Sequence, residues 1–103
     1  MNAQAELRKR LINIGFKITK ESLSCEGFKV YNAFCCEMGE QKMPEEKFLH
    51  IPLELSQNKY YNMLVDKKIR ELKKIIKGLE NAKAPDYSEI DYYKRLLGEI
   101  EKL

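Results

Sequence analysis

Glycine is scarce in this sequence of 103 residues, and no two glycines stand close together. The five copies occupy positions 15, 27, 39, 78 and 98. Loops that hold a nucleotide phosphate need two or three glycines within a few residues, because their backbone must approach the phosphate closely. This spacing therefore excludes a P-loop and a GxGxxG turn from the chain.

Metal-binding side chains are scarce too: His50 is the single histidine, and the three cysteines are Cys25, Cys35 and Cys36. Cys35 and Cys36 are neighbours in an expected strand, so their side chains point to opposite faces. No two cysteines have the C-x₂₋₄-C spacing of a zinc site. We expect no metal site and no Cys–His nucleophile pair, but small buried thiols, and an odd number of cysteines fits reduced thiols.

Long hydrophobic runs are absent as well. No apolar stretch approaches the roughly 18 residues of a membrane-spanning helix, and no hydrophobic signal segment follows Met1. With 44% hydrophobic and 34% charged residues, the composition is that of one small globular domain. We expect a cytoplasmic protein that does not bind membranes.

The sequence does contain a long amphipathic stretch, from Tyr60 to Leu79, whose apolar residues recur every three or four positions. This spacing predicts one stripe on an α-helix, made of Tyr61, Val65, Ile69, Leu72, Ile76 and Leu79, with Leu64 and Ile75 beside it. A second stripe comprises Ile90, Tyr93, Leu97 and Ile100, with Leu96 and Leu103 beside it. Pro85 separates the two, and Asp86 with Glu89 predicts a capping box. We therefore predict an antiparallel coiled-coil hairpin over residues 58–103.

Basic residues gather on the first of these helices. From Lys59 to Lys83 there are 8 basic and 3 acidic residues, whereas residues 86–103 have 3 basic and 5 acidic. A basic helix in less basic surroundings favours a polyanion partner such as nucleic acid. The alternative is a solubilising face that pairs with the acidic second helix. The candidate RNA-binding residues are Lys67, Lys68, Arg70, Lys73, Lys74 and Lys77.

The first 39 residues predict a helix followed by a β-hairpin. Asn2 is the expected N-cap and Gly15 the expected C′ residue. The expected buried face comprises Ala3, Leu7, Leu11 and Ile14, with Arg8, Lys9 and Arg10 mostly off it. Residues 16–23 and 28–38 predict the two strands, with a turn at 24–27.

The second expected strand is apolar on both faces. Phe28, Val30, Phe34, Cys36 and Met38 share one face, whereas Tyr31, Ala33 and Cys35 share the other. Such strands belong to sheets that are covered on both sides, and an isolated hairpin is only marginally stable. We expect either an N-terminal half of a larger protein or self-association to complete the sheet. The segment 40–57, which contains Pro44 and Pro52, is then a connector, with Ser56 or Asn58 capping the long helix.

Three groups of residues, taken in order, form a known pattern. The first group is Asn2-Ala3, Leu7-Arg8, Leu11 and Gly15-Phe16-Lys17-Ile18; the second is Glu21, Leu23, Glu26-Gly27, Lys29, Tyr31 and Glu37-Met38-Gly39; the third is Pro52-Leu53 and Leu55. Their order resembles the C-terminal portion of a bacterial tRNA (adenine-N1)-methyltransferase family, which modifies an adenine in the D-arm of tRNA. In departures from that pattern, Gly27 stands one place early, Ile51 replaces a glycine, and Cys35-Cys36 replace aliphatic residues.

The resemblance implies an α/β fold: a helix and β-hairpin from the end of a Rossmann-like methyltransferase sheet (1–39), the connector, and the coiled coil. It implies the C-terminal part of a SAM-dependent tRNA methyltransferase, whose coiled coil contributes to tRNA binding. S-adenosylmethionine would bind at the carboxyl ends of early strands, which this sequence lacks. We therefore assign no catalytic or cofactor-binding residue, and expect the chain alone to bind no cofactor and to be inactive. The alternative is a free-standing interaction protein that dimerises through its hairpin and binds a partner through its helices.

Overall fold

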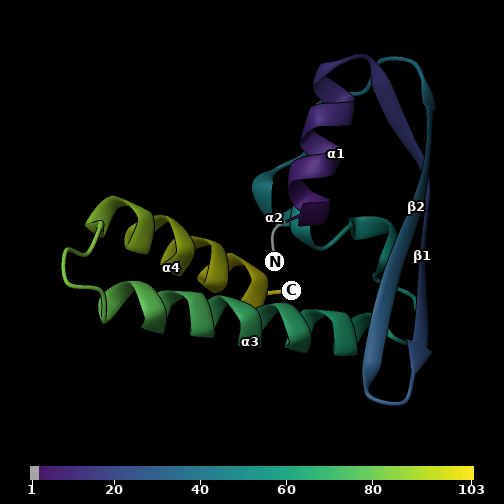
Figure 1. Cartoon of the computed structure of the whole chain (residues 1–103). Helices are drawn as coiled ribbons and strands as arrows, with labels where there is room; N and C mark the ends of the chain where they lie inside the picture. Colours follow the sequence, from purple (N-terminus) through teal and green to yellow (C-terminus); the bar gives the residue numbers. More distant parts are fainter. Residues whose placement is uncertain (1–2) are drawn as a thin grey trace. The chain divides into compact units, whose positions relative to one another are not determined.

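The computed structural model describes residues 3–103, so the predicted N-cap Asn2 lies outside the described residues. The elements in chain order are α1 (Ala3–Asn13), β1 (Phe16–Glu26), β2 (Lys29–Met38), α2 (Glu46–His50), the 3₁₀ helix η1 (Leu53–Leu55), α3 (Tyr61–Glu80) and α4 (Tyr87–Glu101) (Figure 1). This succession of a helix, an antiparallel hairpin and a helical pair confirms the predicted fold class. The chain divides into two compact units, the first ending at Leu64 and the second running from Val65 to Leu103.

Helix α1 ends as predicted, but it buries a different face. The N–H of Gly15 donates to the carbonyl of Ile12, and Gly15 has a φ of +98°, which glycine adopts at low cost after a helix. The buried side chains are those of Ala5, Arg8 and Ile12, whereas Leu7 is 48% and Ile14 is 70% exposed. The predicted face was wrong because the spacing of apolar residues gives no sign that an arginine will be buried. Arg8 is buried because polar groups from other elements compensate its charge.

The two strands form one antiparallel hairpin that is longer than predicted. Glu26 pairs with Lys29 across a loop of two residues, and Gly27 has the positive φ that a type II′ turn needs at its first central position. The pairing shifts between Ile18 and Lys20, which marks a β-bulge. Val30, Asn32 and Phe34 are on the covered face of β2, and Tyr31, Ala33 and Cys35 on the other are exposed.

The connector contains two short helices that the sequence did not predict. In the first unit, Leu49 of α2 joins a core cluster with Ala5 and Ile12 of α1, and Ile18 and Met43 pack against this cluster. Neither short helix has a side-chain cap, so tertiary packing rather than a local signal accounts for them. Before α3, the side chain of Asn58 accepts a hydrogen bond from the N–H of Tyr60.

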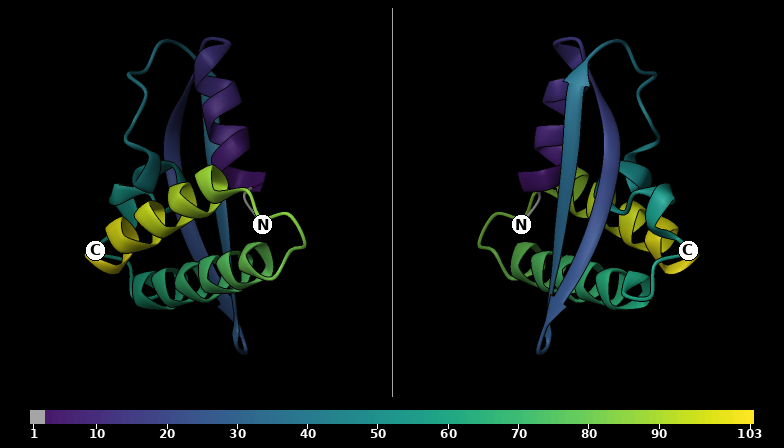
Figure 2. Two further views of the ribbon diagram at one scale, coloured as in Figure 1. Left: turned by 90° about the vertical axis from the view of Figure 1, so that its left-hand side faces the viewer. Right: turned by 90° about the vertical axis from the view of Figure 1, so that its right-hand side faces the viewer.

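Helices α3 and α4 run antiparallel in the second unit (Figures 1 and 2). Asp86 caps α4 as predicted, since its carboxylate accepts hydrogen bonds from the N–H groups of Ser88 and Glu89. Leu72 of α3 and Ile100 of α4 are fully buried, in agreement with the predicted stripes. Among residues 3–103, no helix combines the length and the apolar character that crossing a membrane requires.

Candidate functional site

The solvent-exposed side of α3 carries a basic stripe, defined here as Lys67, Arg70, Lys73, Lys74 and Lys77. All five side chains are exposed. At 100° per residue, four of them fall within an arc of about 80°, with Lys73 about 40° further round. Leu72 and Ile76, which are buried, lie on the opposite side of the helix. With a rise of 1.5 Å per residue, the stripe is about 15 Å long.

At four of the five positions of this stripe, no described acidic side chain neutralises the charge. Arg70, Lys73, Lys74 and Lys77 make no hydrogen bond or ion pair with any other described residue. An ion pair between the two helices has the reverse polarity, because Nζ of Lys94 in α4 lies 3.3 Å from Oε2 of Glu80 in α3. The predicted alternative, in which the acids of α4 pair with the lysines of α3, therefore has no support at these four positions.

Lys68 is placed apart from the other five candidate RNA-binding residues. It is buried, and its Nζ lies 3.6 Å from Glu71 Oε2 in an i,i+3 ion pair. One residue beyond Lys67 turns the side chain by 100°, toward the apolar side of the helix. The structure thus brings five of the six candidates to one exposed surface, whereas the Lys68 side chain is buried.

The tyrosine side chains differ in their packing and in how far they are exposed to solvent. Tyr92 and Tyr93 form a T-shaped pair, with ring centroids 5.1 Å apart, and burial raises the pKa of Tyr61 above its ordinary 10.0. Tyr87, which the sequence did not single out, is 76% exposed at the start of α4. Tyr87 stands three residues before Ile90, a spacing that fits the apolar stripe, so no local signal predicted its exposure.

The cysteines are more exposed than predicted. Cys25 is half-buried, whereas Cys35 and Cys36 are exposed, so the expectation of small buried thiols was wrong. For Cys35 the reason is that the outer face of β2, which carries it, is uncovered. Within residues 3–103, no three His, Cys, Asp or Glu side chains are placed to hold a metal ion together.

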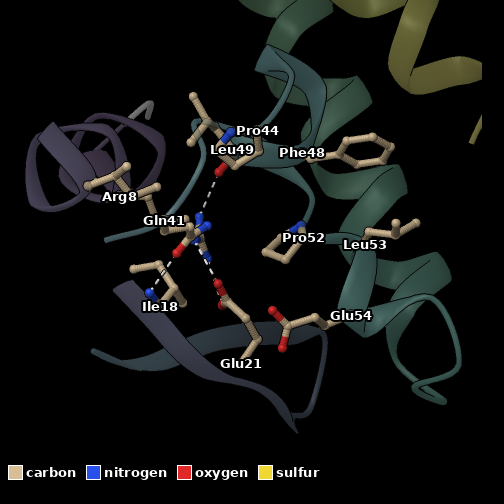
Figure 3. A pocket seen from close by; sticks show the side chains of 11 residues that line it. Arg8, Ile18, Glu21, Gln41, Pro44, Phe48, Leu49, Pro52, Leu53 and Glu54 are labelled. Carbon is tan, nitrogen blue, oxygen red and sulfur yellow. Dashed lines mark hydrogen bonds and ion pairs between the residues drawn. The ribbon is translucent and has the colours of Figure 1, made fainter. Parts of the chain in front are cut away.

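The first unit holds a pocket of about 290 Å³ beside the guanidinium group of Arg8 (Figure 3). Its apolar walls are Ile12, Ile18, Pro44, Phe48, Pro52 and Leu53, and its polar lining includes Glu21, Gln41 and Glu54. Gln41 Oε1 accepts a hydrogen bond from the N–H of Ile18 at 2.8 Å, which ties the connector to β1.

The Arg8 side chain is occupied by structural contacts. Its Nε and Nη2 donate to the two oxygens of Glu21, both at 3.0 Å, and Nη2 also donates to Asn32 Oδ1 at 2.7 Å. Nη1 donates to the carbonyl oxygen of Leu49 at 2.8 Å. The Arg8 and Glu21 side chains are 3% and 2% exposed, and the guanidinium lies over the ring of Phe34. One N–H remains for any ligand, so this pair joins α1, the hairpin and α2 instead of offering a reactive group.

No protein-family model matches the sequence, and no curated protein sequence does. In its fold the chain is similar to a solved structure from Streptococcus pneumoniae, that of a candidate tRNA (m1A22) methyltransferase. The TM-score is 0.71 and the sequence identity 20%, over 96% of this chain. The chain spans 44% of the length of that protein. The two therefore share a fold across nearly the whole of the present chain.

Proposed function

We propose that this chain is the RNA-contacting C-terminal part of a SAM-dependent tRNA (adenine-N1) methyltransferase. The basic stripe of α3 is the observation that carries the proposal, because it is exposed, continuous and, at four positions, unpaired among the described residues. The similarity in fold to a candidate tRNA (m1A22) methyltransferase supports tRNA as the polyanion. A tRNA substrate would place the protein in the cytoplasm.

The stripe suits a phosphate backbone better than a set of bases. Its members are flexible cations along about 15 Å of one helix, and such side chains bind phosphates through charge and release the counterions around them. Contacts of this type position a nucleic acid and carry no sequence information directly. We therefore assign tRNA docking to α3, and the choice of the modified adenine to another part of the complete enzyme.

S-adenosylmethionine does not fit the residues present here. In Rossmann-like folds the cofactor binds where a parallel strand leads into a helix through a glycine-rich turn. The sheet of the described residues is an antiparallel pair, and Gly27 serves a hairpin turn. We derive no chemical step for this chain, and propose that the cofactor belongs to the methyltransferase half of the complete enzyme.

The test is tRNA binding at several salt concentrations by a variant with Arg70, Lys74 and Lys77 replaced by glutamine. Each phosphate contact contributes about 0.7–0.9 to the slope of log affinity against log salt, so the slope should fall by about 2 to 3. A matched control replaces Lys9, Lys20 and Lys42, which are exposed residues of the first unit, and changes the net charge equally. Equal slopes in the two variants, with helicity retained, would contradict the RNA-binding role.

A second candidate function is that of a free-standing interaction protein. The exposed outer face of β2 favours it, because Tyr31, Ala33 and Cys35 are uncovered on a hairpin of two strands. A hairpin alone is marginally stable in water. Binding of a partner by the helices, with no dependence on RNA, is the result that would support this function over the first.

A further inference from the structure

The unpaired members of the basic stripe are spread across α3 as well as along it. They are Arg70, Lys73, Lys74 and Lys77, which we call the four-cation patch. Consecutive residues of an α-helix point 100° apart, so Lys73 and Lys74 diverge to the two sides of the line that joins Arg70 to Lys77. On a helix about 10–12 Å across, this divergence separates the two lysine side chains by about 8 Å. Along the axis, Arg70 and Lys77 are about 10 Å apart.

Acidic residues limit the four-cation patch at both of its ends. Asp66 is exposed and precedes Arg70 by one turn, on the same side of the helix. Glu80 is exposed and follows Lys77 by about one turn, where it pairs with Lys94 of α4. Carboxylates repel phosphates, so a nucleic acid on this side of α3 makes its closest contacts over about 10 Å of helix.

The exposed side of α3 also lacks a surface on which nucleic-acid bases stack. From 65 to 80, all within the described residues, the exposed side chains are charged, and Gly78 is the one other exposed residue. The tyrosines of the second unit, Tyr87, Tyr92 and Tyr93, belong to α4. Proteins that bind single strands combine cations with aromatic side chains that stack on successive bases. The four-cation patch supplies the cations alone, which favours a partner whose bases are already paired.

We propose that the four-cation patch docks on a double-stranded stem of the RNA, across the narrow groove of its A-form helix, and binds phosphates of both strands. The major groove of A-form RNA is too deep and narrow for side chains to read its bases. A helix that presents only cations can lie over this groove, with a row of phosphates on each side. Lys73 and Lys74 suit the two rows because they diverge, whereas a single strand offers one row.

This inference rests on the proposed function, since it specifies which part of an RNA the basic stripe contacts. It adds a distinction between paired and unpaired RNA that the proposed function does not make. It also distinguishes A-form from B-form duplexes, because the major groove of B-DNA is about 12 Å wide and sets its phosphate rows further apart. Both distinctions can fail while the RNA-binding role of the stripe stands.

The test is binding of the full chain to three probes at several salt concentrations. The probes are an RNA duplex of about 16 base pairs, a DNA duplex of the same sequence, and an oligouridine strand with as many phosphates as the RNA duplex. The RNA duplex should bind at least about tenfold more tightly than oligouridine and about threefold more tightly than the DNA duplex. The slope of log affinity against log salt should be about 3 to 4 for the RNA duplex, because four contacts contribute about 0.9 each.

Two single variants test whether both strands are contacted. Lys73→Gln and Lys74→Gln should each lower the slope for the RNA duplex by about 0.9, since the two lysines reach opposite rows of phosphates. Lys9→Gln is the matched control, because Lys9 is exposed on α1 in the first unit, and it should leave the slope unchanged. Circular dichroism should show equal helicity in all three variants. An unchanged slope in either Lys73→Gln or Lys74→Gln would overturn contact with two strands.

The remaining outcomes separate this inference from the proposed function. Oligouridine or the DNA duplex bound as tightly as the RNA duplex would overturn docking on an A-form stem. If replacing Arg70, Lys74 and Lys77 still lowered the salt slope in that case, the RNA-binding role would be retained. A chain that bound none of the three probes in a salt-dependent manner would contradict the proposed function, and this inference with it.

Discussion

Helices α1 and α3 both carry several basic residues, but they place them in opposite environments. In α1 the side chain of Arg8 is buried, and Leu7 and Ile14 remain exposed. In α3 the apolar residues Leu72 and Ile76 are buried, and the basic stripe faces solvent. The difference shows that the surface opposite a helix decides which face is buried. The hairpin offers Glu21 and Asn32 to α1, whereas α4 offers an aliphatic seam to α3.

The largest effect should come from breaking the buried pair of the first unit. Replacing Arg8 with alanine leaves the Glu21 carboxylate buried without its counter-charge, which costs about 3–5 kcal/mol of unfolding free energy. Urea denaturation measures the loss. The control is a double variant, Arg8→Met with Glu21→Leu, which removes both charges and should recover most of the stability. A loss in the double variant as large as in Arg8→Ala would show that the charge pair is not the reason for the burial.

A somewhat smaller loss of unfolding free energy is expected from truncating a buried side chain between α3 and α4. Leu72 is fully buried, and truncating such a leucine to alanine costs about 2–5 kcal/mol through lost burial and the cavity that remains. Lys73→Ala, on the exposed side of the same helix, is the control and should change stability by less than about 0.5 kcal/mol. Hydrogen exchange of α3 and α4 would locate the loss. Equal effects of the two substitutions would contradict the assignment of the buried face.

The smallest of these effects concerns the start of α4. Asp86 accepts two backbone hydrogen bonds there, and removing an N-cap side chain costs about 0.5–2 kcal/mol. Asp86→Asn, which keeps an acceptor oxygen, should retain most of the stability, whereas Asp86→Ala should not. Thermal unfolding compares the two. If alanine and asparagine behaved alike, the cap would contribute little, and α4 would be stabilised mainly by packing against α3.

Sequence patterns predicted the second unit better than the first. The helices over Tyr61–Glu80 and Tyr87–Glu101 follow from apolar spacing, and the cap at Asp86 follows from its side chain. Both signals are local, because a helix places residues three and four apart on one face whatever surrounds it. The exposed position of five candidate RNA-binding residues follows from the same geometry, and so does the turn of Lys68 toward the apolar side of the helix.

The short helices of the connector and the pocket beside Arg8 were not predictable in this way. Their contacts join residues far apart in the chain, such as Arg8 with Leu49. No local spacing records that Arg8 will meet a carboxylate, an amide and a backbone carbonyl at once. The same holds for Cys35, whose exposure depends on which face of β2 the first helix covers.

The sequence by itself determined the order of the long helices and the two strands, the amphipathic helical pair, the turn at Gly27 and the concentration of basic charge on α3. These depend on backbone preferences and on periodicity, which act within a few residues. Only the tertiary structure decided that Arg8 is inside, that Leu7 is outside, and that the outer face of β2 is exposed. Burying a charge costs free energy unless partners from other elements compensate it, and only the folded chain brings those partners together.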